Sequence, residues 1–518
     1  MLVLVPRPLA WSACKGLSRA HASLPFSLRH SATRALSSTR VAFSTTETPV
    51  ESAPFRLAVI GSGPGGFYTA QRVLRRLPNA KVDMFEALPI PHGLVRYGVA
   101  PDHPEVKNVM STFDEVAENP NFRFIGNTSV GTLNQPNAKP AALEMSDLQP
   151  NYHAILLAYG APEDRAFGIP GEDRLVGVMG ARTFVGFYNG LPSEQNLDLD
   201  LSKTDTAVVL GQGNVALDVA RILLMPLEEL KKTDLTEKTI KLLEKSTIKH
   251  VHVVGRRGPL EVAFTSKELR EMINLPDTTF HMDKELFDSE MALGGKSLDR
   301  PRKRLMSLLE KGMKESKPNQ SKSWTLSFLR SPKAFKDSPE NPGVLSSIEF
   351  GINRLESQEG GPRRAVDTGK TEELKCGMAF RSIGYKSIGI QGIPFDERKG
   401  IVPNIGGKVV DAQNNIVPGL YTSGWLKTGP VGVIVSTMSE AFQTAETLVE
   451  DVKNGALGPL EPKAGAEPLL EKLKEKGVRT VSYQDWKRIE QIEFQRGAQL
   501  GKPREKVLSV EEMLHLVD

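Results

Sequence analysis

Two glycine-rich turns, about 150 residues apart, are the segments of this chain best suited to bind a phosphate group. The first, 61–66 (GSGPGG), follows the apolar run 57–60, and the second, 211–216 (GQGNVA), follows the apolar run 207–210. Each turn continues into a helical pattern, so both stand at a strand-to-helix junction, where glycines let the backbone approach a pyrophosphate. The helix N-terminus then offers free N–H groups to the phosphate oxygens. The sequence therefore predicts two dinucleotide sites, and the contacts expected from the first turn are Gly61, Gly63, Gly65 and Gly66.

The residues that follow the two turns differ in charge, and this difference separates the two ligands. Glu86 ends the second predicted strand about 20 residues after the first turn, where a carboxylate accepts hydrogen bonds from a ribose diol. Arg256 and Arg257 end the corresponding strand after the second turn, where two guanidinium groups suit a 2′-phosphate. The first site is thus expected to hold the adenosine half of FAD or NAD, and the second to hold NADPH. The alternative is an ordinary α/β protein whose two glycine turns bind nothing.

The length and charge of the chain limit the classes of function it can have. Its 518 residues suffice for about two or three domains. Residues 1–46 carry six basic side chains and no acidic one and are rich in Ser and Ala, which is typical of an organelle transit peptide. Without these six charges the formal net charge of +4 becomes about −2, so nucleic-acid binding has little support. The regular spacing of the arginines favours the mitochondrion over the plastid, and a tail without a targeting role is the alternative.

Cysteine content and hydropathy exclude further classes. Of the two cysteines, Cys14 lies in the predicted leader, which leaves Cys376 alone in the body of the chain. One thiol cannot form an internal disulfide, a dithiol redox pair or an iron–sulfur ligand set. We expect no metal site, and no transmembrane segment either, because no apolar run approaches about 18–20 residues.

The order of the predicted elements indicates an α/β protein built from two Rossmann-like nucleotide-binding domains. Residues 55–158 and 382–518 are expected to form a discontinuous FAD-binding domain, and residues 159–381 an NADP-binding domain inserted into it. Within the inserted domain, residues 226–246 have the pattern of a charged helical insertion. Residues from about 283 to 342 have the pattern of a basic helix followed by polar loops.

A late strand, turn and helix are expected to return to the first domain. The strand ends near Gly424, and a long helix begins near Gly432 and continues toward Glu450. A helix N-terminus in this position contributes roughly 0.3–2 kcal/mol toward holding an anionic flavin ring. A plain surface loop between strand and helix is the alternative.

Taken together, these segments resemble the mitochondrial adrenodoxin reductase family, also called the ferredoxin–NADP reductases of the adrenodoxin type. The resemblance covers nearly everything after residue 55. The matching segments are Gly61–Gln71, Gly93–Pro104, Ala181–Gly190, Gly211–Leu224, Val254–Phe264, Lys267–Met272, Arg300–Leu305, Ser382–Lys386, Trp425–Ile434 and Gly501–Lys506.

The resemblance implies specific cofactor-binding residues. For FAD they are Gly65, Glu86, Leu94, Val130, Trp425, Gly432, Val433 and Ile434. For NADPH they are Gln212, Gly213, Asn214, Val215, Arg256, Arg257, Glu268 and Gly432. Leu94, Val130 and Glu268 depend on the resemblance alone. Gly65 departs from the family, in which Ala is frequent at this position, and that exchange preserves the turn.

The resemblance also implies an activity and a partner. Members of the family are FAD-dependent NADPH:ferredoxin oxidoreductases that pass electrons one at a time to an acidic [2Fe–2S] ferredoxin, a task that suits a flavin. Arg270, Arg300 and Arg304 match the family's docking arginines, and the last two share one face of a predicted helix. A solvated charged face is the alternative. The expected location is the mitochondrial matrix, with peripheral contact to the inner membrane left open.

His103 and Asp218 are the candidates for handling protons or tuning the flavin, and no covalent catalysis is expected. Each has a structural alternative. Asp102 and Glu105 match a capping box at the start of a helix, which would make His103 part of that cap. Asp218 can complement the first turn of its own helix.

Two other functions use the same pair of nucleotide sites. A flavin-dependent NADPH monooxygenase is expected to carry a Phe-x-Gly-x-x-x-His element between the turns, and residues 67–210 do not contain one. A non-catalytic NADPH sensor would bind the cofactor without turnover.

Overall fold

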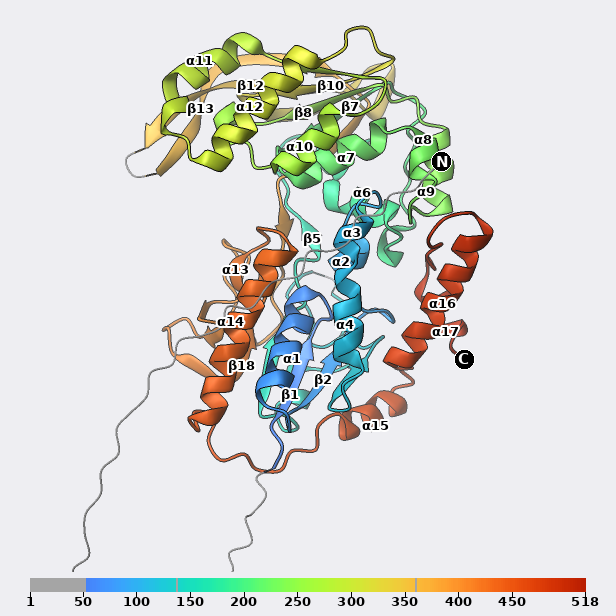
Figure 1. Cartoon of the computed structure of the whole chain (residues 1–518), viewed down its shortest axis with the longest axis vertical. Helices are drawn as coiled ribbons and strands as arrows, with labels where there is room; N and C mark the ends of the chain where they lie inside the picture. The colour runs from blue at the N-terminus through green and yellow to red at the C-terminus, as the bar shows by residue number, and fades with distance from the viewer. Residues whose placement is uncertain (1–52, 137, 359–360) are drawn as a thin grey trace, which may run out of the picture. The chain divides into compact units, whose positions relative to one another are not determined.

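The computed structural model describes residues 53–518 apart from residues 137 and 359–360 (Figure 1). The expected transit peptide, residues 1–46, lies outside the described residues. We call residues 53–158 and 382–518 the first lobe and residues 159–381 the second lobe, after the two main sheets to which they contribute.

Seven strands of the described chain form the sheet of the first lobe, in the order β16-β17-β18-β4-β1-β2-β3. The strands from β18 to β3 are parallel, while β16, β17 and β18 pair antiparallel at one edge. Central β1 is buried along nearly its whole length, as an apolar run in a parallel sheet requires. The bounds are β1 (Arg56–Ile60), β2 (Lys81–Phe85), β3 (Phe122–Ile125), β4 (Ala154–Leu157), β16 (Asn404–Ile405), β17 (Lys408–Val410) and β18 (Ile416–Thr422).

Two distant segments of the chain build this sheet together. Leu420 of β18 lies opposite Ile155 of β4, so the late strand joins the early ones (Figure 1). Helix α14 packs on helix α1, and Arg72 of α1 forms an ion pair with Glu446 of α14 at 2.5 Å. The helices of this lobe are α1 (Pro64–Arg76), α2 (Leu94–Tyr97), α3 (Pro104–Lys107), α4 (Val109–Ala117), α5 (Met145–Leu148), α13 (Trp425–Thr428), α14 (Ile434–Lys453), α15 (Glu467–Glu475), α16 (Tyr483–Gln499) and α17 (Val510–His515).

The main sheet of the second lobe has six strands within the described ranges, all parallel, in the order β6-β14-β7-β8-β10-β9. Its bounds are β6 (Val178–Gly180), β7 (Thr206–Leu210), β8 (His250–Val254), β9 (Thr278–Met282), β10 (Lys322–Ser327) and β14 (Met378–Arg381). The helices around it are α6 (Ala181–Tyr188), η1 (Pro192–Glu194), α7 (Asn214–Leu224), α8 (Leu227–Leu230), α9 (Glu237–Glu244), η2 (Pro259–Glu261), α10 (Ser266–Ile273), α11 (Lys284–Gly294), η3 (Gly295–Ser297) and α12 (Arg300–Glu315). The predicted insertion at 226–246 is therefore two short helices, α8 and α9, separated by a turn.

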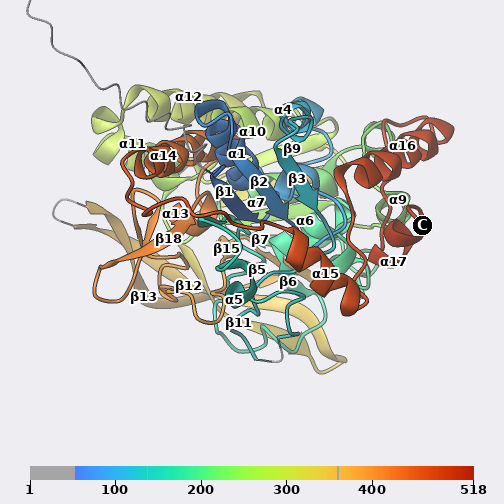
Figure 2. The ribbon, with the colours of Figure 1, turned by 90° about the horizontal axis from the view of Figure 1, so that it is seen from below.

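The chain passes between the lobes twice, at one place. Short strand β5 (Glu163–Asp164) lies just after the first crossing, and β15 (Tyr385–Lys386) lies just after the second (Figure 2). The two strands pair antiparallel, with Tyr385 opposite Asp164. The connections thus support each other, as expected where one nucleotide fold is inserted into another.

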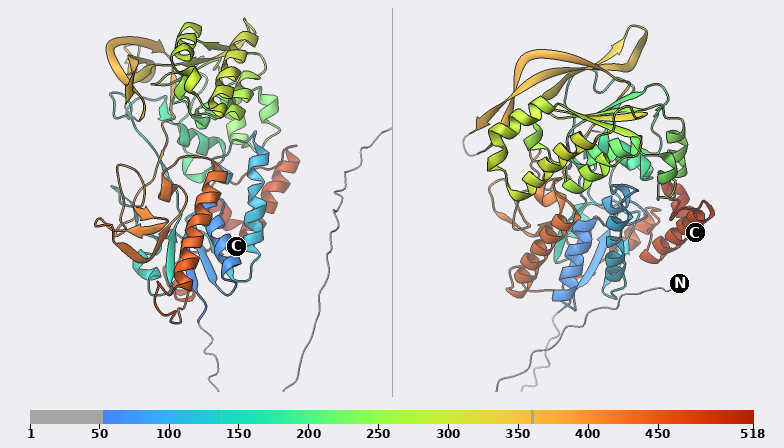
Figure 3. Two further views of the ribbon diagram at one scale, coloured as in Figure 1. Left: turned by 60° about the vertical axis from the view of Figure 1, so that its left-hand side comes forward. Right: turned by 45° about the horizontal axis from the view of Figure 1, so that its top comes forward.

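The prediction of polar loops up to residue 342 was wrong. After α12 the chain forms β10 and then a further antiparallel sheet, which within the described residues has the order β11 (Arg330–Ser338), β12 (Asn341–Gln358) and β13 (Gly361–Lys375). We call it the wing sheet, and Figure 3 shows its long curved strands in yellow and orange. Trp324 and Leu326 of β10 are buried between polar neighbours. Such alternation makes a strand, while the polar neighbours give the segment the composition of a loop.

The C-terminal segment of the first lobe contacts the second lobe. Lys506 Nζ lies 3.1 Å from Asp234 Oδ2 in the second lobe, and Lys107 of α3 donates to the same carboxylate at 2.7 and 2.8 Å. Both lysines are buried, so this carboxylate balances two charges away from water. Among the described helices, none is long and apolar enough to cross a membrane.

Candidate functional site

The first glycine turn joins β1 to α1, and its glycines have different structural duties. Gly61 has φ 101°, and a Cβ there would lie 2.6 Å from the carbonyl oxygen of Ala158. A Cβ on Gly66 would lie 2.2 Å from the carbonyl oxygen of Gly61. At Gly63, by contrast, no atom of the described residues lies within 4 Å of such a Cβ. The fold thus requires glycine at positions 61 and 66, while at Gly63 the described residues leave room for a Cβ.

The late segment of the first lobe packs directly on this turn. Ser423 and Thr69 both donate to the carbonyl oxygen of Gly65, at 3.3 and 2.7 Å. A Cβ on Gly65 would lie 3.2 Å from Gly424 Cα, so the alanine frequent in the family would fit here only with a slight shift of Gly424. The expectation that a late strand ending near Gly424 returns to the first domain is confirmed, because β18 pairs with β4.

Glu86 follows β2 directly and turns its carboxylate toward the glycine turn. Its Oε2 accepts hydrogen bonds from the backbone N–H and the hydroxyl of Ser62 at 3.0 and 2.6 Å. The backbone of Leu88 donates to the other oxygen at 3.1 Å. The carboxylate is therefore held beside the turn, the position from which such a group binds a ribose diol.

Leu94 and Val130 lie in two other segments of the same lobe. Leu94 opens α2 after Gly93, whose added Cβ would lie 3.2 Å from Gly63 Cα, so this segment borders the open space at the turn. Val130 is buried and forms an isolated bridge with Leu143.

The second turn, between β7 and α7, repeats the arrangement. Gly211 has φ 142°, and a Cβ there would lie 2.0 Å from the carbonyl oxygen of Ser382. At Gly213, as at Gly63, no atom of the described residues lies within 4 Å of an added Cβ. Buried Ala216 takes the place of the third glycine. The side chain of Gln212 donates to the carbonyl oxygen of Ser327 at 2.9 Å, which ties the turn to the end of β10.

One cavity of about 1100 Å³ brings the second turn together with residues of the first lobe. The predicted residues on its wall are Gln212, Gly213, Asn214, Val215, Arg256, Arg257, Trp425, Gly432 and Val433. The described lining does not include Glu268, Ile434 or the first glycine turn. A cavity of this volume has room for a dinucleotide, and its wall is made largely of backbone and apolar atoms with a few charged groups.

The wall also carries residues that the sequence did not single out as ligands. They include Asp164, Arg330, Arg381 and Tyr385. The Tyr385 ring stands edge-on to Trp425, with ring centroids 5.2 Å apart, and Tyr385 is buried. Tyr385 lies in one of the segments that carry the family resemblance, which is the signal that could have found it.

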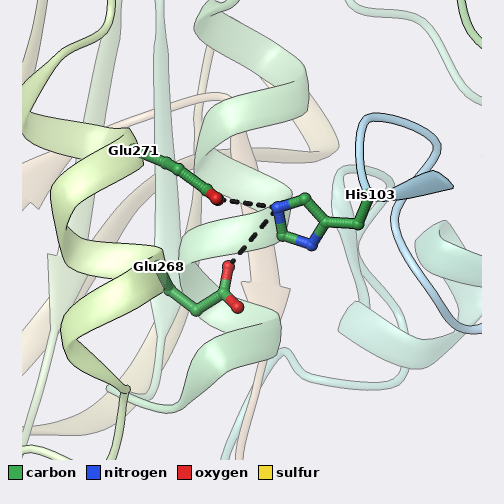
Figure 4. Close-up of side chains that lie close together, drawn as sticks. All are labelled: His103, Glu268 and Glu271. Carbon is green, nitrogen blue, oxygen red and sulfur yellow. Dashed lines mark hydrogen bonds and ion pairs between the residues drawn. The ribbon is translucent and has the colours of Figure 1, made fainter. Parts of the chain in front are cut away.

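His103 lies in a cluster of charged side chains between the lobes rather than on the cavity wall as described (Figure 4). Its Nε2 lies 2.6 Å from Glu271 Oε2 and 3.8 Å from Glu268 Oε2, both on α10. These three side chains could hold a metal ion. The guanidinium of Arg221 already lies 3.4 Å from the Glu268 carboxylate, however, and supplies positive charge there.

Arg221 of α7 connects the two candidate residues, His103 and Asp218, because it binds the carboxylates of Asp218 and of Asp102 beside His103. Its Nη2 donates to Asp218 at 2.7 Å, and its Nε donates to Asp102 at 2.5 Å. The predicted capping box is therefore wrong, because Asp102 pairs with Arg221, and the N-cap residue of α3 is His103, whose side chain makes no capping hydrogen bond to that helix. Burial raises the pKa of Asp218, and the charge of Arg221 offsets part of this rise. Burial and the charge of Asp218 raise the pKa of Glu268 to about 7.

Comparisons with known proteins agree with this arrangement. Residues 55–275 match a family model described as pyridine nucleotide-disulphide oxidoreductase. The chain is 48% identical to the NADPH:adrenodoxin oxidoreductase of Bos taurus over 473 residues, which cover 89% of this chain and 92% of that one. Its identity to the protein of that name from Salvelinus fontinalis is 47%, over 91% and 92% of the two chains.

The chain belongs to the mitochondrial NADPH:adrenodoxin oxidoreductase family. A solved structure, Mycobacterium tuberculosis FprA in complex with NADPH, has 36% identity and a TM-score of 0.82 and covers 90% of this chain and 99% of its own. Membership confirms both the resemblance found in the sequence and the predicted α/β fold with two nucleotide-binding domains.

The basic residues predicted to dock the partner lie on two helices that pack together, α10 and α12. Arg270 of α10 is exposed, as are Arg300 and Arg304 of α12. The helix at 300–305 was predicted correctly, and Arg300 opens it. We call these three residues the basic patch.

Proposed function

We propose that the protein is an FAD-dependent NADPH:ferredoxin oxidoreductase that passes electrons one at a time to an acidic mitochondrial [2Fe–2S] ferredoxin of the adrenodoxin type. The observation that carries this proposal is the cavity in which Gly213, Arg256 and Arg257 of the second lobe meet Trp425 and Val433 of the first. A nicotinamide dinucleotide bound to the second turn can therefore extend toward a flavin bound by the first lobe.

The residues fit the two cofactors by an independent criterion. Both turns have a helix N-terminus, a glycine with free space at Gly63 or Gly213, and a charged group at the end of the next strand. We assign FAD to the lobe of residues 55–158 and 382–518, and NADPH to residues 159–381. We assign the ribose diol of FAD to Glu86, whose fixed carboxylate would repel a 2′-phosphate.

A bound flavin accepts a hydride and releases single electrons, which is the chemistry that connects NADPH to a one-electron acceptor. The chain's own residues bind and orient the two cofactors. Tyr385 and Trp425 pack edge to face on the cavity wall, and the backbone at Gly432 and Val433 leads into the N-terminus of α14. These groups would shield the reacting faces of the two cofactors from water, and the N-terminus of α14 would favour negative charge on a flavin beside it.

We assign the handling of protons to the cluster of His103, Asp218, Glu268 and Arg221. Burial raises the pKa of both carboxyl groups, that of Glu268 to about 7, so Glu268 can hold a proton near neutral pH. Replacing Asp218 by Ala tests the assignment through the pH profile of ferredoxin reduction. An unchanged profile would remove Asp218 from the proposal.

We assign ferredoxin docking to the basic patch. Its exposed charges should act on encounter rate and salt dependence more than on the chemical step. The double variant Arg300→Glu/Arg304→Glu should lower the rate with ferredoxin and flatten its dependence on salt, while reduction of a small artificial acceptor stays unchanged. Lys284→Glu on α11, an exposed residue outside the patch, is the matched control. An undiminished salt dependence in the double variant would refute the assignment.

We place the protein in the mitochondrial matrix, because residues 1–46 have the composition of a transit peptide. Import of the full chain into isolated mitochondria, followed by carbonate extraction, separates matrix protein from protein attached to the inner membrane.

The same preparation distinguishes the alternatives. NADPH oxidation coupled to reduction of an artificial one-electron acceptor supports the reductase. Product that forms only with oxygen and an organic substrate would indicate a monooxygenase, and NADPH binding without turnover would indicate a sensor.

A further inference from the structure

The wing sheet touches the proposed NADPH site at the end of β8. The backbone N–H of Leu329 donates to the carbonyl oxygen of Arg257 at 3.1 Å, and that of Arg330 donates to Gly255 at 3.1 Å. Leu329 immediately precedes β11 and Arg330 is its first residue, so the wing sheet begins beside the arginine pair. The segment after β8 that carries the two arginines is thus bonded to a sheet that the nucleotide fold itself does not require.

Asn353 of β12 adds further hydrogen bonds between the wing sheet and the segment of Arg256 and Arg257. Its side-chain Nδ2 donates to the carbonyl oxygen of Arg256 at 2.9 Å and to Ser331 Oγ at 2.8 Å. Its backbone N–H donates to Leu329 at 2.8 Å. Asn353 is only 6% exposed, so these bonds form away from competing water.

Arg330 contributes another guanidinium to the cavity wall that carries Arg256 and Arg257. Its Nε and Nη2 donate to the carboxylate of Glu372 on β13, the latter at 3.2 Å, and its Nη1 donates to Phe328 O at 2.7 Å. These bonds fix the side chain, a third of which is exposed. The side chains of Arg256 and Arg257 form no ion pair with any residue that the structure describes.

We propose that the wing sheet forms part of the subsite for the 2′-phosphate of NADPH, with Arg330 as a third binding arginine and Asn353 as a positioning residue for Arg256. The proposal rests on the proposed function of the second lobe. A phosphate monoester presents three strong acceptor oxygens, so Arg330 can add donors to those of Arg256 and Arg257. Glu372 holds Arg330 at the wall and at the same time reduces the net positive charge that the phosphate meets.

The test measures equilibrium binding of 2′,5′-ADP and of 5′-AMP to the FAD-loaded protein by calorimetry, without any catalytic step. Arg330→Ala should weaken 2′,5′-ADP binding about tenfold or more, because a charge-assisted bond to the phosphate is lost. Binding of 5′-AMP should stay within about twofold, since it lacks the 2′-phosphate. Arg354→Ala is the matched control, because Arg354 is an exposed wing arginine that also pairs with a glutamate, Glu356, and lies off the cavity wall.

A second variant guards against a folding defect. Arg330→Glu/Glu372→Arg exchanges the partners and keeps their ion pair, yet it places a carboxylate at the cavity wall. It should fold and bind 5′-AMP like the original protein but lose 2′,5′-ADP binding. Retained 2′,5′-ADP binding in either variant overturns the role of Arg330, as does an equal loss of both ligands.

Asn353→Leu tests the positioning role. Removing the bond to Arg256 should lower the preference for 2′,5′-ADP over 5′-AMP about fivefold, the equivalent of one ordinary hydrogen bond. A residue that only stabilised the fold would change the melting temperature and leave this preference intact, and that result would overturn the assignment. If the original protein itself shows no preference for 2′,5′-ADP, the proposed NADPH site fails rather than the role of the wing.

Discussion

Replacing Gly213 by alanine separates what the fold needs from what the nucleotide needs. The residue is the N-cap of α7, with φ −99° and ψ 179°, a backbone conformation that alanine adopts readily. A methyl group there would meet no described atom within 4 Å. If the free space belongs to a pyrophosphate, the variant should fold normally and fail to bind NADPH.

The magnitudes follow from this geometry. Alanine loses a favourable N-cap residue, at a cost of about 0.5–1 kcal/mol, and restricts the unfolded chain, which returns about 0.4–1 kcal/mol. The free energy of unfolding should therefore change by less than about 1 kcal/mol, and the melting temperature by less than about 4 °C. A methyl group between the backbone and the phosphate removes at least one charge-assisted hydrogen bond, so the Kd for NADP⁺ should rise about 10- to 100-fold.

The assay is calorimetric titration of the purified flavoprotein with NADP⁺, beside thermal unfolding and the flavin absorbance of the same sample. Gly211→Ala is the contrasting variant, because its methyl group would lie 2.0 Å from the carbonyl oxygen of Ser382 at φ 142°. That change should destabilise the second lobe itself. The reasoning is refuted if Gly213→Ala binds NADP⁺ as tightly as the original protein, or if it unfolds like Gly211→Ala.

Three further predictions concern stability and FAD. Asp234→Asn should destabilise the protein by about 3 kcal/mol or more at pH 6, because buried Lys107 and Lys506 lose their shared carboxylate, and chemical denaturation measures this. A change no larger than that of an exposed-pair control, Glu228→Gln, would contradict it. Since the pKa of Glu268 is raised to about 7 from an ordinary value of 4.5, its contribution to stability is full below pH 4.5 and is lost as pH rises through 7. Glu268→Gln should thus gain stability relative to the original protein between pH 5 and 7.5, and parallel pH curves would exclude this. Glu86→Gln should weaken FAD binding about tenfold through loss of a charged acceptor, measured as flavin released on dilution, and unchanged retention would remove Glu86 from the site.

Local patterns made the core of the fold predictable. Strands β1 and β7 each end in four consecutive apolar residues that glycine follows directly, and Gly61 and Gly211 have φ 101° and 142°, a backbone conformation that favours glycine. Glu86 and Arg256 stand at the end of the next strand, a position set by the length of one strand–helix–strand unit. Spacing along the chain alone therefore located both nucleotide turns.

Other features depend on contacts that spacing does not reveal. The wing sheet was missed because the polar outer residues of β11 and β12 outnumber its buried side chains. Asp102 looked like a cap, but Arg221, 119 positions later, binds its carboxylate and outweighs the local preference for a capping bond. Arg330 and Asn353 lie about 70 and 100 positions after the arginine pair and contact this segment only through tertiary structure, Arg330 by its backbone bond to Gly255 and Asn353 by its side-chain bond to Arg256.

Anaerobic titration with NADPH, followed by the flavin absorbance and then by addition of oxidised [2Fe–2S] ferredoxin, tests the central claim most directly. The account predicts a yellow protein that NADPH bleaches at stoichiometric amounts, that NADH bleaches poorly, and whose colour returns as ferredoxin is reduced. A folded protein that stays colourless when supplied with FAD, or one that NADH and NADPH reduce equally well, would contradict it.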